Sequence, residues 1–215
     1  MLYSLFCAYA FSMPFELVFK YWFSIDTIFK PFRILSLLII ALYIINGIRT
    51  VFYFKNENRS DFLLYGVFIY GIIASLIRSM TGFFNQKLFY NDLFQSGLYL
   101  ITFFIFKSLM LTSRQLVRLL NFFLVGVILN AAYIFYLNVV LRYSGRLSGF
   151  TDNPNYVALG IVVAATWVLL RLNANRKFLK IAGLGFLVVF FIFVLGVTGS
   201  RTGLVIFLVS IFLAF

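Results

Sequence analysis

The sequence predicts an all-α protein, built as a polytopic bundle of membrane-spanning helices. Its 215 residues are 63% hydrophobic and only 11% charged, and the mean hydropathy is +1.03. Soluble domains contain roughly 45–50% apolar and about 25% charged residues. The apolar residues also form long runs, and a bilayer core of about 30 Å requires roughly 20 apolar residues per helix. These observations exclude a soluble enzyme, a nucleic-acid-binding protein and a disordered chain.

The apolar runs predict about eight spans in a single transmembrane domain over residues 1–215. Their approximate bounds are 2–18, 34–54, 62–80, 93–111, 117–141, 156–172, 181–197 and 202–215. Pro14 interrupts the first run, since proline cannot continue a helix normally. The last run is still apolar at Phe215, after about two-thirds of a span. We therefore expect an incomplete last span and the amino-terminal part of a longer protein.

The residue types that are scarce limit the chemistry. The chain contains no histidine and a single cysteine, Cys7. This composition excludes a disulfide framework and a cysteine-based metal site, and it removes the commonest general base and metal ligand. We therefore predict no metal and no cofactor. Any chemistry would depend on arginines, carboxylates, hydroxyls and amides.

The net charge of +12 is read as a sign of topology, because cytoplasmic loops collect Lys and Arg. The segment 171–180 contains Arg171, Arg176, Lys177 and Lys180 and no acid, so we place it in the cytoplasm. Alternation of the spans then places the loops on the outer side at 19–33, 81–92, 142–155 and 198–202.

Several arginines do not follow this charge bias. Arg142, Arg146 and Arg201 all fall on the predicted outer side. An anionic ligand at that face would explain them.

The first candidate site is the polar segment 142–156, which joins two apolar spans. Asp152 or Asn153 can cap the following helix, and Pro154 suits its first turn. One interpretation stops at a well-formed helix start. The other notes that free N–H groups at a helix start favour anions, so that Arg142 and Arg146 beside them could hold a phosphate or pyrophosphate.

The second candidate site is the segment 198–203, which divides one long apolar stretch into two helices with Arg201 at the break. An ionisable group at that depth suggests function, whereas the structural interpretation is an arginine that extends to the lipid headgroups. Gly199 and Gly203 have the spacing of a helix-packing motif, but they flank a polar break, so we do not expect them to mediate packing. Arg78, near the outer end of the third run, either joins the anion site or extends to the headgroups.

Together the two segments suggest a family. The run Arg146-Leu-Ser-Gly-Phe-Thr-Asp-Asn-Pro-Asn155, then a span, a basic loop, another span and Gly199-Ser-Arg-Thr-Gly203, resembles the O-antigen ligase and O-antigen polymerase superfamily. In that family a glycine–(x)–Asn-Pro-Asn stretch opens one membrane helix, and a Ser-Arg pair lies at the outer end of a later one. The motifs cover residues 140–215, and upstream only the number and spacing of spans agree.

The resemblance implies a GT-C-like, metal-independent glycosyltransferase with multiple spans in the bacterial inner membrane. Such enzymes move a glycan from an undecaprenyl-pyrophosphate carrier to an acceptor at the outer face. Arginines would neutralise the pyrophosphate leaving group, with Arg201 as the first catalytic candidate and Arg146 as the second. The implied substrate-binding residues are Arg142, Asn153, Asn155, Ser200 and Arg78. The implied partners are the lipid-linked glycan, the bilayer, and chain-length regulator and flippase proteins, with no nucleic acid.

The chain also departs from the family. Its members are usually longer and carry a large outer loop, which contains a histidine in ligases. We therefore expect this chain to hold part of a site. The Gly-Phe-Thr-Asp-Asn-Pro-Asn run favours a polymerase over a ligase. The alternatives are a polytopic transporter or lipid-linked glycan flippase, in which the arginines line a passage for an anionic substrate, and a non-catalytic subunit of a polysaccharide export complex.

Overall fold

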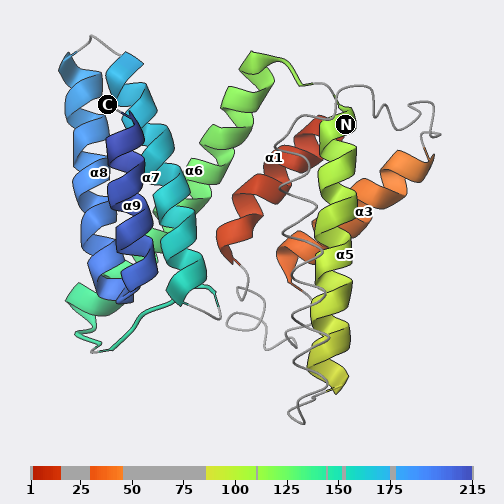
Figure 1. The fold of residues 1–215 in the computed structure, drawn as a ribbon, viewed down its shortest axis with the longest axis horizontal. Coiled ribbons are helices and arrows are strands. Elements are labelled where there is room, and N and C mark those ends of the chain that lie inside the picture. Colours follow the sequence, from red (N-terminus) through yellow and green to blue (C-terminus); the bar gives the residue numbers. More distant parts are fainter. Residues whose placement is uncertain are drawn as a thin grey trace. The chain divides into compact units, whose positions relative to one another are not determined.

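The computed structural model describes residues 2–15, 30–45, 86–109, 111–143, 145–151, 154–174 and 178–214. Within these ranges the regular structure is helical and contains no strand (Figure 1). The all-α prediction is therefore confirmed. In chain order the helices are α1 (Leu2–Ser12), η1 (Met13–Phe15), α3 (Pro31–Ile45), α5 (Gln86–Ser108), α6 (Ser113–Phe135), η2 (Tyr136–Val140), α7 (Pro154–Ala174), α8 (Phe178–Thr198) and α9 (Arg201–Ala214).

Among the described residues, three helical stretches are long and apolar enough to cross a membrane. They are Ser113–Val140, Pro154–Leu172 and Lys180–Thr198. They match the predicted runs 117–141, 156–172 and 181–197. By length and composition these helices indicate a membrane protein.

Within the described ranges, no helix of spanning length matches the other five predicted runs. Four helices are apolar but shorter than a span in the described ranges: Leu2–Phe15, Pro31–Ile45, Gly97–Ser108 and Arg201–Ile211. Helix α1 ends at Ser12, and the tighter turn η1 contains Pro14. Helix α5 starts at Gln86, and its apolar stretch within the described ranges is Gly97–Ser108. The predicted run 62–80 lies outside the described residues.

By their contacts the residues divide into two compact units. Unit 1 comprises Met1–Phe6 and Arg33–Thr112, and unit 2 comprises Cys7–Phe32 and Ser113–Phe215. In unit 1 the ring of Phe6 packs against Phe106, with 5.3 Å between ring centroids. Unit 2 contains the three candidate spans and both candidate sites.

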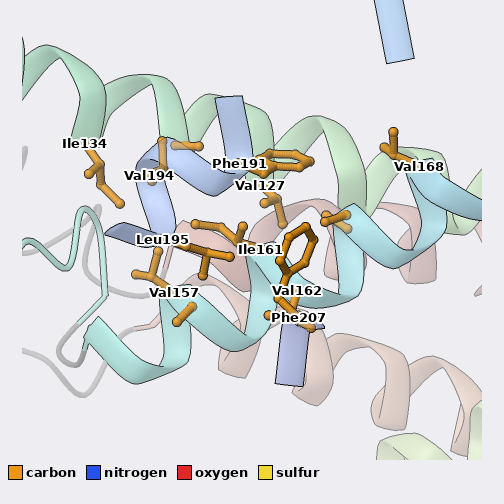
Figure 2. Close-up of a cluster of buried hydrophobic side chains, with 14 of the residues drawn as sticks. Val127, Ile134, Val157, Ile161, Val162, Val168, Phe191, Val194, Leu195 and Phe207 are labelled. Atoms are coloured by element: carbon orange, nitrogen blue, oxygen red, sulfur yellow. The ribbon is translucent and has the colours of Figure 1, made fainter. Parts of the chain in front are cut away.

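The core of unit 2 is centred on α7, which packs against α8, α9 and α6. Half of the residues in its buried apolar cluster lie on α7, and Figure 2 shows Val157 and Ile161 beside Leu195 of α8. Small residues such as Ala158 and Ala165 allow neighbouring helices to approach closely. The buried cluster is Val127, Ala131, Ile134, Leu147, Val157, Ala158, Ile161, Val162, Ala164, Ala165, Val168, Leu169, Phe191, Val194, Leu195 and Phe207.

The chain direction brings several helix ends together at one end of unit 2. Helix α6 runs toward the connection at 141–153, and α7 starts from that connection (Figure 1). Helix α8 returns to the same end, and α9 leaves it in the direction of α7 (Figure 1). The starts of α7 and α9 therefore lie at one end of the unit, with the two candidate segments.

Helix packing explains Gly203, contrary to the sequence-based expectation. A Cβ atom at Gly203 would lie 2.7 Å from Cβ of Ala158 on α7, which is closer than two side chains can approach. The expectation was wrong because the chain reverses at residues 199–200. Helix α9 folds back onto α7, so Gly203 belongs to an α7–α9 contact and does not share a helix face with Gly199.

We predict that Gly203→Ala destabilises the protein by roughly 1–3 kcal/mol, the usual cost of inserting a group into a packed core. The midpoint of thermal unfolding in detergent should fall accordingly. Gly185→Ala is the matched control, because a Cβ at that position on α8 would meet no atom within 4 Å. Ala158→Gly should restore part of the loss in the Gly203→Ala background. An unchanged midpoint for Gly203→Ala would contradict the close α7–α9 contact.

Candidate functional site

The break between α8 and α9 is closed by local hydrogen bonds. Gly199 has a φ of +61°, the left-handed conformation that glycine adopts easily after a helix end. Its N–H donates to the carbonyl of Gly196 at 3.1 Å. The hydroxyl of Thr198 donates to the carbonyl of Leu195 at 2.8 Å. The break predicted at 198–203 is therefore confirmed as a tight turn.

Ser200 caps α9. Its Oγ accepts a hydrogen bond from the N–H of Gly203 at 3.2 Å, and the residue is buried. A serine at this position satisfies one of the N–H groups that a helix start leaves without a partner. The structure thus gives Ser200 a capping role, and its part in substrate binding stays a prediction.

Arg201 is the first residue of α9 and is exposed. No hydrogen bond or ion pair joins its side chain to the part of the chain that the structure describes. Within the described ranges its guanidinium donors are therefore not used by the protein, at a helix start where the backbone also favours negative charge.

Helix α6 ends in a wide turn. Its last residues form the π-helix η2, in which the N–H of Leu141 donates to the carbonyl of Tyr136 at 3.2 Å. Arg142 follows with a φ of +50°, and it is exposed. A left-handed arginine is unusual because its Cβ crowds the backbone. This turn directs the chain from α6 into the next segment.

Residues 145–151, here called the Arg146 segment, return toward the bundle. Leu147, Phe150 and Thr151 are buried, whereas Arg146 is exposed. A turn closes the segment, because both the N–H and the hydroxyl of Thr151 donate to the carbonyl of Ser148, at 3.0 and 2.9 Å. The apolar side chains hold the segment on unit 2 and leave the arginine facing outward.

Asn130 on α6 holds the same segment. Its Oδ1 accepts a hydrogen bond from the N–H of Phe150 at 3.0 Å. The ring of Phe150 stacks on Tyr133, with 4.2 Å between centroids and an interplanar angle of 12°. Sequence reasoning missed Asn130. The signal that could have found it is an amide inside a long apolar run, since polar groups in a membrane helix usually have a partner.

Arg146 joins the two candidate segments. Its Nε donates to the carbonyl oxygen of Thr198 at 3.3 Å, across 52 residues of sequence. Its Nη2 donates to Oδ1 of Asn155, in the first turn of α7, also at 3.3 Å. A cation at the C-terminal end of α8 is favourable because the last carbonyl groups of a helix carry partial negative charge. One side chain thus ties the end of α8 to the start of α7.

The resulting arrangement, the arginine end of unit 2, contains Arg142, Arg146, Arg201 and the starts of α7 and α9. Each helix start carries about half a positive charge. Guanidinium groups beside them can bind phosphate oxygens through paired hydrogen bonds and can stabilise negative charge as it develops. The described part of this end is therefore suited to an anionic group.

The remaining predicted residues divide into two groups. Pro154 is the first residue of α7, as expected, and Asn155 lies beside Arg146. Arg78 and Asn153 lie outside the described residues, as does Asp152. Among the described side chains, no group of three or more histidine, cysteine or carboxylate residues is placed to hold a metal ion.

Comparisons with known proteins add no relative. No protein-family model, no curated protein and no solved structure matches the chain.

We predict that Gly199→Ala destabilises the protein by about 1–2 kcal/mol, the cost of a left-handed conformation for a residue with a Cβ. The new methyl group would also lie 3.3 Å from Cγ of Arg146. Thermal unfolding in detergent measures the effect. Gly196→Ala, one turn earlier and with no atom within 4 Å of its Cβ, should cause no loss. Equal stability of the two variants would argue against the turn at Gly199.

Proposed function

We propose that the arginine end is the pyrophosphate-binding part of a membrane glycosyltransferase for surface polysaccharides. The enzyme would transfer or polymerise a glycan carried on undecaprenyl pyrophosphate. The observation that supports this proposal best is the pair of hydrogen bonds from Arg146 to Thr198 and Asn155. These bonds join the two segments whose sequences resemble the O-antigen polymerase and ligase superfamily.

The reaction requires stabilisation of a leaving group. The hydroxyl of the acceptor sugar attacks the anomeric carbon of the donor glycan and releases its proton to the solvent, and the bond from that carbon to the pyrophosphate oxygen breaks. The products are the extended glycan and undecaprenyl pyrophosphate. Negative charge grows on the departing oxygen, so fixed positive groups close to it lower the barrier.

The contacts suggest different roles for the arginines. Arg146 uses Nε and Nη2 in bonds to the protein, so it has fewer donors left for the pyrophosphate. Arg201 is exposed and makes no such bonds within the described residues. In our proposal Arg201 is the main contact with the leaving group, and Arg146 lies beside it and holds the turn in place. Arg142, Asn155 and Ser200 border the same end.

The depth of the site supports a lipid-linked substrate. The arginine end lies where the three candidate spans begin or end. A carrier lipid keeps its chain in the hydrocarbon and its pyrophosphate at the bilayer surface. We propose the outer face of the bacterial inner membrane, a polymerase in preference to a ligase, and chain-length regulator and flippase proteins as partners.

We predict that Arg201→Ala, introduced into the protein in its native host, abolishes long glycan chains at the cell surface. Loss of one fixed donor of this kind lowers the catalytic rate roughly 10²- to 10³-fold. Arg201→Lys should retain some long chains, because it keeps the charge and loses the paired geometry. Electrophoresis of the surface glycan measures chain length. Arg114→Ala is the control, since this exposed arginine lies at the opposite end of α6.

The same strains separate the alternatives. A normal polymer from a stably expressed Arg201→Ala variant would refute the catalytic proposal. Accumulation of carrier-linked repeat units at the inner face would favour the flippase. Accumulation at the outer face, with no polymer, would support the glycosyltransferase.

A further inference from the structure

The amide of Asn130 connects α6 with the segment that carries Arg146. Asn130 lies inside the candidate span Ser113–Val140 and is only 3% exposed. Its Oδ1 accepts the hydrogen bond from Phe150 N–H at 3.0 Å. A buried amide oxygen or N–H that lacks a hydrogen-bond partner destabilises the folded protein. Each group therefore restricts the position of the other.

Two neighbouring contacts restrict the same position. Gly149 has a φ of +56°, and a Cβ at this residue would collide with Oδ1 of Asn130. On the other side, the ring of Phe150 is stacked on Tyr133, which lies about one turn after Asn130 on α6. The Arg146 segment therefore has a defined seat on α6, with the Asn130 amide at its centre.

This seat determines where Arg146 can reach. Only Leu147 and Ser148 separate Arg146 from Gly149, and Leu147 is itself buried. Such a short connection allows Arg146 little movement relative to Gly149. A shift of Gly149 and Phe150 away from Asn130 would move the Arg146 guanidinium away from Thr198 and Asn155.

We propose that Asn130 is a positioning residue, which seats the Arg146 segment and so holds Arg146 at the break between α8 and α9. The seating of the Arg146 segment by Asn130 does not depend on any reaction. A dependence of glycan transfer on Asn130 rests on the proposed function.

Thiol labelling tests the seat directly. Leu147→Cys places a thiol at a buried position of the segment, and Cys7→Ala removes the native thiol. In the detergent-solubilised full chain, we expect slow reaction of this thiol with a water-soluble maleimide. Adding Asn130→Leu should increase the labelling rate roughly tenfold or more, because the segment opens when its N–H loses the amide.

Asn121→Leu is the matched control. Asn121 lies on the same helix, and its Oδ1 accepts a hydrogen bond from Nε1 of Trp167 at 3.2 Å, away from the Arg146 segment. This variant also loses one amide hydrogen bond on α6. We expect a labelling rate within about twofold of the parent, since the affected contact does not involve the segment.

Gly149→Ala tests the contact from the other side and decides the question if Asn130→Leu does not fold. It should accelerate labelling to a similar extent. The double variant Asn130→Leu/Gly149→Ala should label no faster than either single variant by more than about threefold, because both changes break the same contact. Unchanged labelling in Gly149→Ala, or equal acceleration by Asn121→Leu, would overturn the proposal.

Glycan length then tests the link to function. If Asn130→Leu opens the segment and also shortens the surface glycan, the positioning role in transfer is supported. If the segment opens while the glycan keeps its length, the role in transfer is refuted and the seat itself stands. Failure of the Arg201→Ala test would refute the proposed function and leave the labelling result unaffected.

Discussion

The need of every buried backbone group for a hydrogen-bond partner determines the structure of unit 2. Water does not reach a buried polar group, so the protein itself must supply the partner. The features of the candidate site meet this need: Ser200 caps α9, Asn130 accepts from Phe150, and Arg146 reaches the last carbonyl of α8. The candidate site and a set of well-formed helix ends are here built from the same residues.

Close packing between α7 and α9 is the second requirement of this structure. Helix α9 can return along α7 only because Gly203 and Ala158 have small side chains, and the reversal requires the left-handed Gly199. Without this reversal, α9 would continue away from α7 and would not pack along it. The return of α9 onto the bundle thus depends on two glycines.

Part of this organisation could be predicted from the sequence. Long apolar runs identified the three candidate spans, Pro154 marked the start of α7, and the polar residues at 198–203 marked a break. The contacts of Arg146 could not be predicted, because one acceptor is a backbone carbonyl, which has no sequence signature. Asn130 was missed because its partner is a backbone N–H on another segment. The packing role of Gly203 was misread because it depends on how the chain turns.

The π-helix at the end of α6 has a consequence for comparison with other chains. A turn of this kind accommodates one residue more than an α-helical turn, so a chain without that residue can end the helix with an ordinary α-helical turn. The buried face of α6 up to Ile134 and the direction of the chain into the Arg146 segment would then stay in place. In an alignment of related sequences, residues 136–140 are therefore the part of α6 where a gap of one residue is compatible with the same bundle.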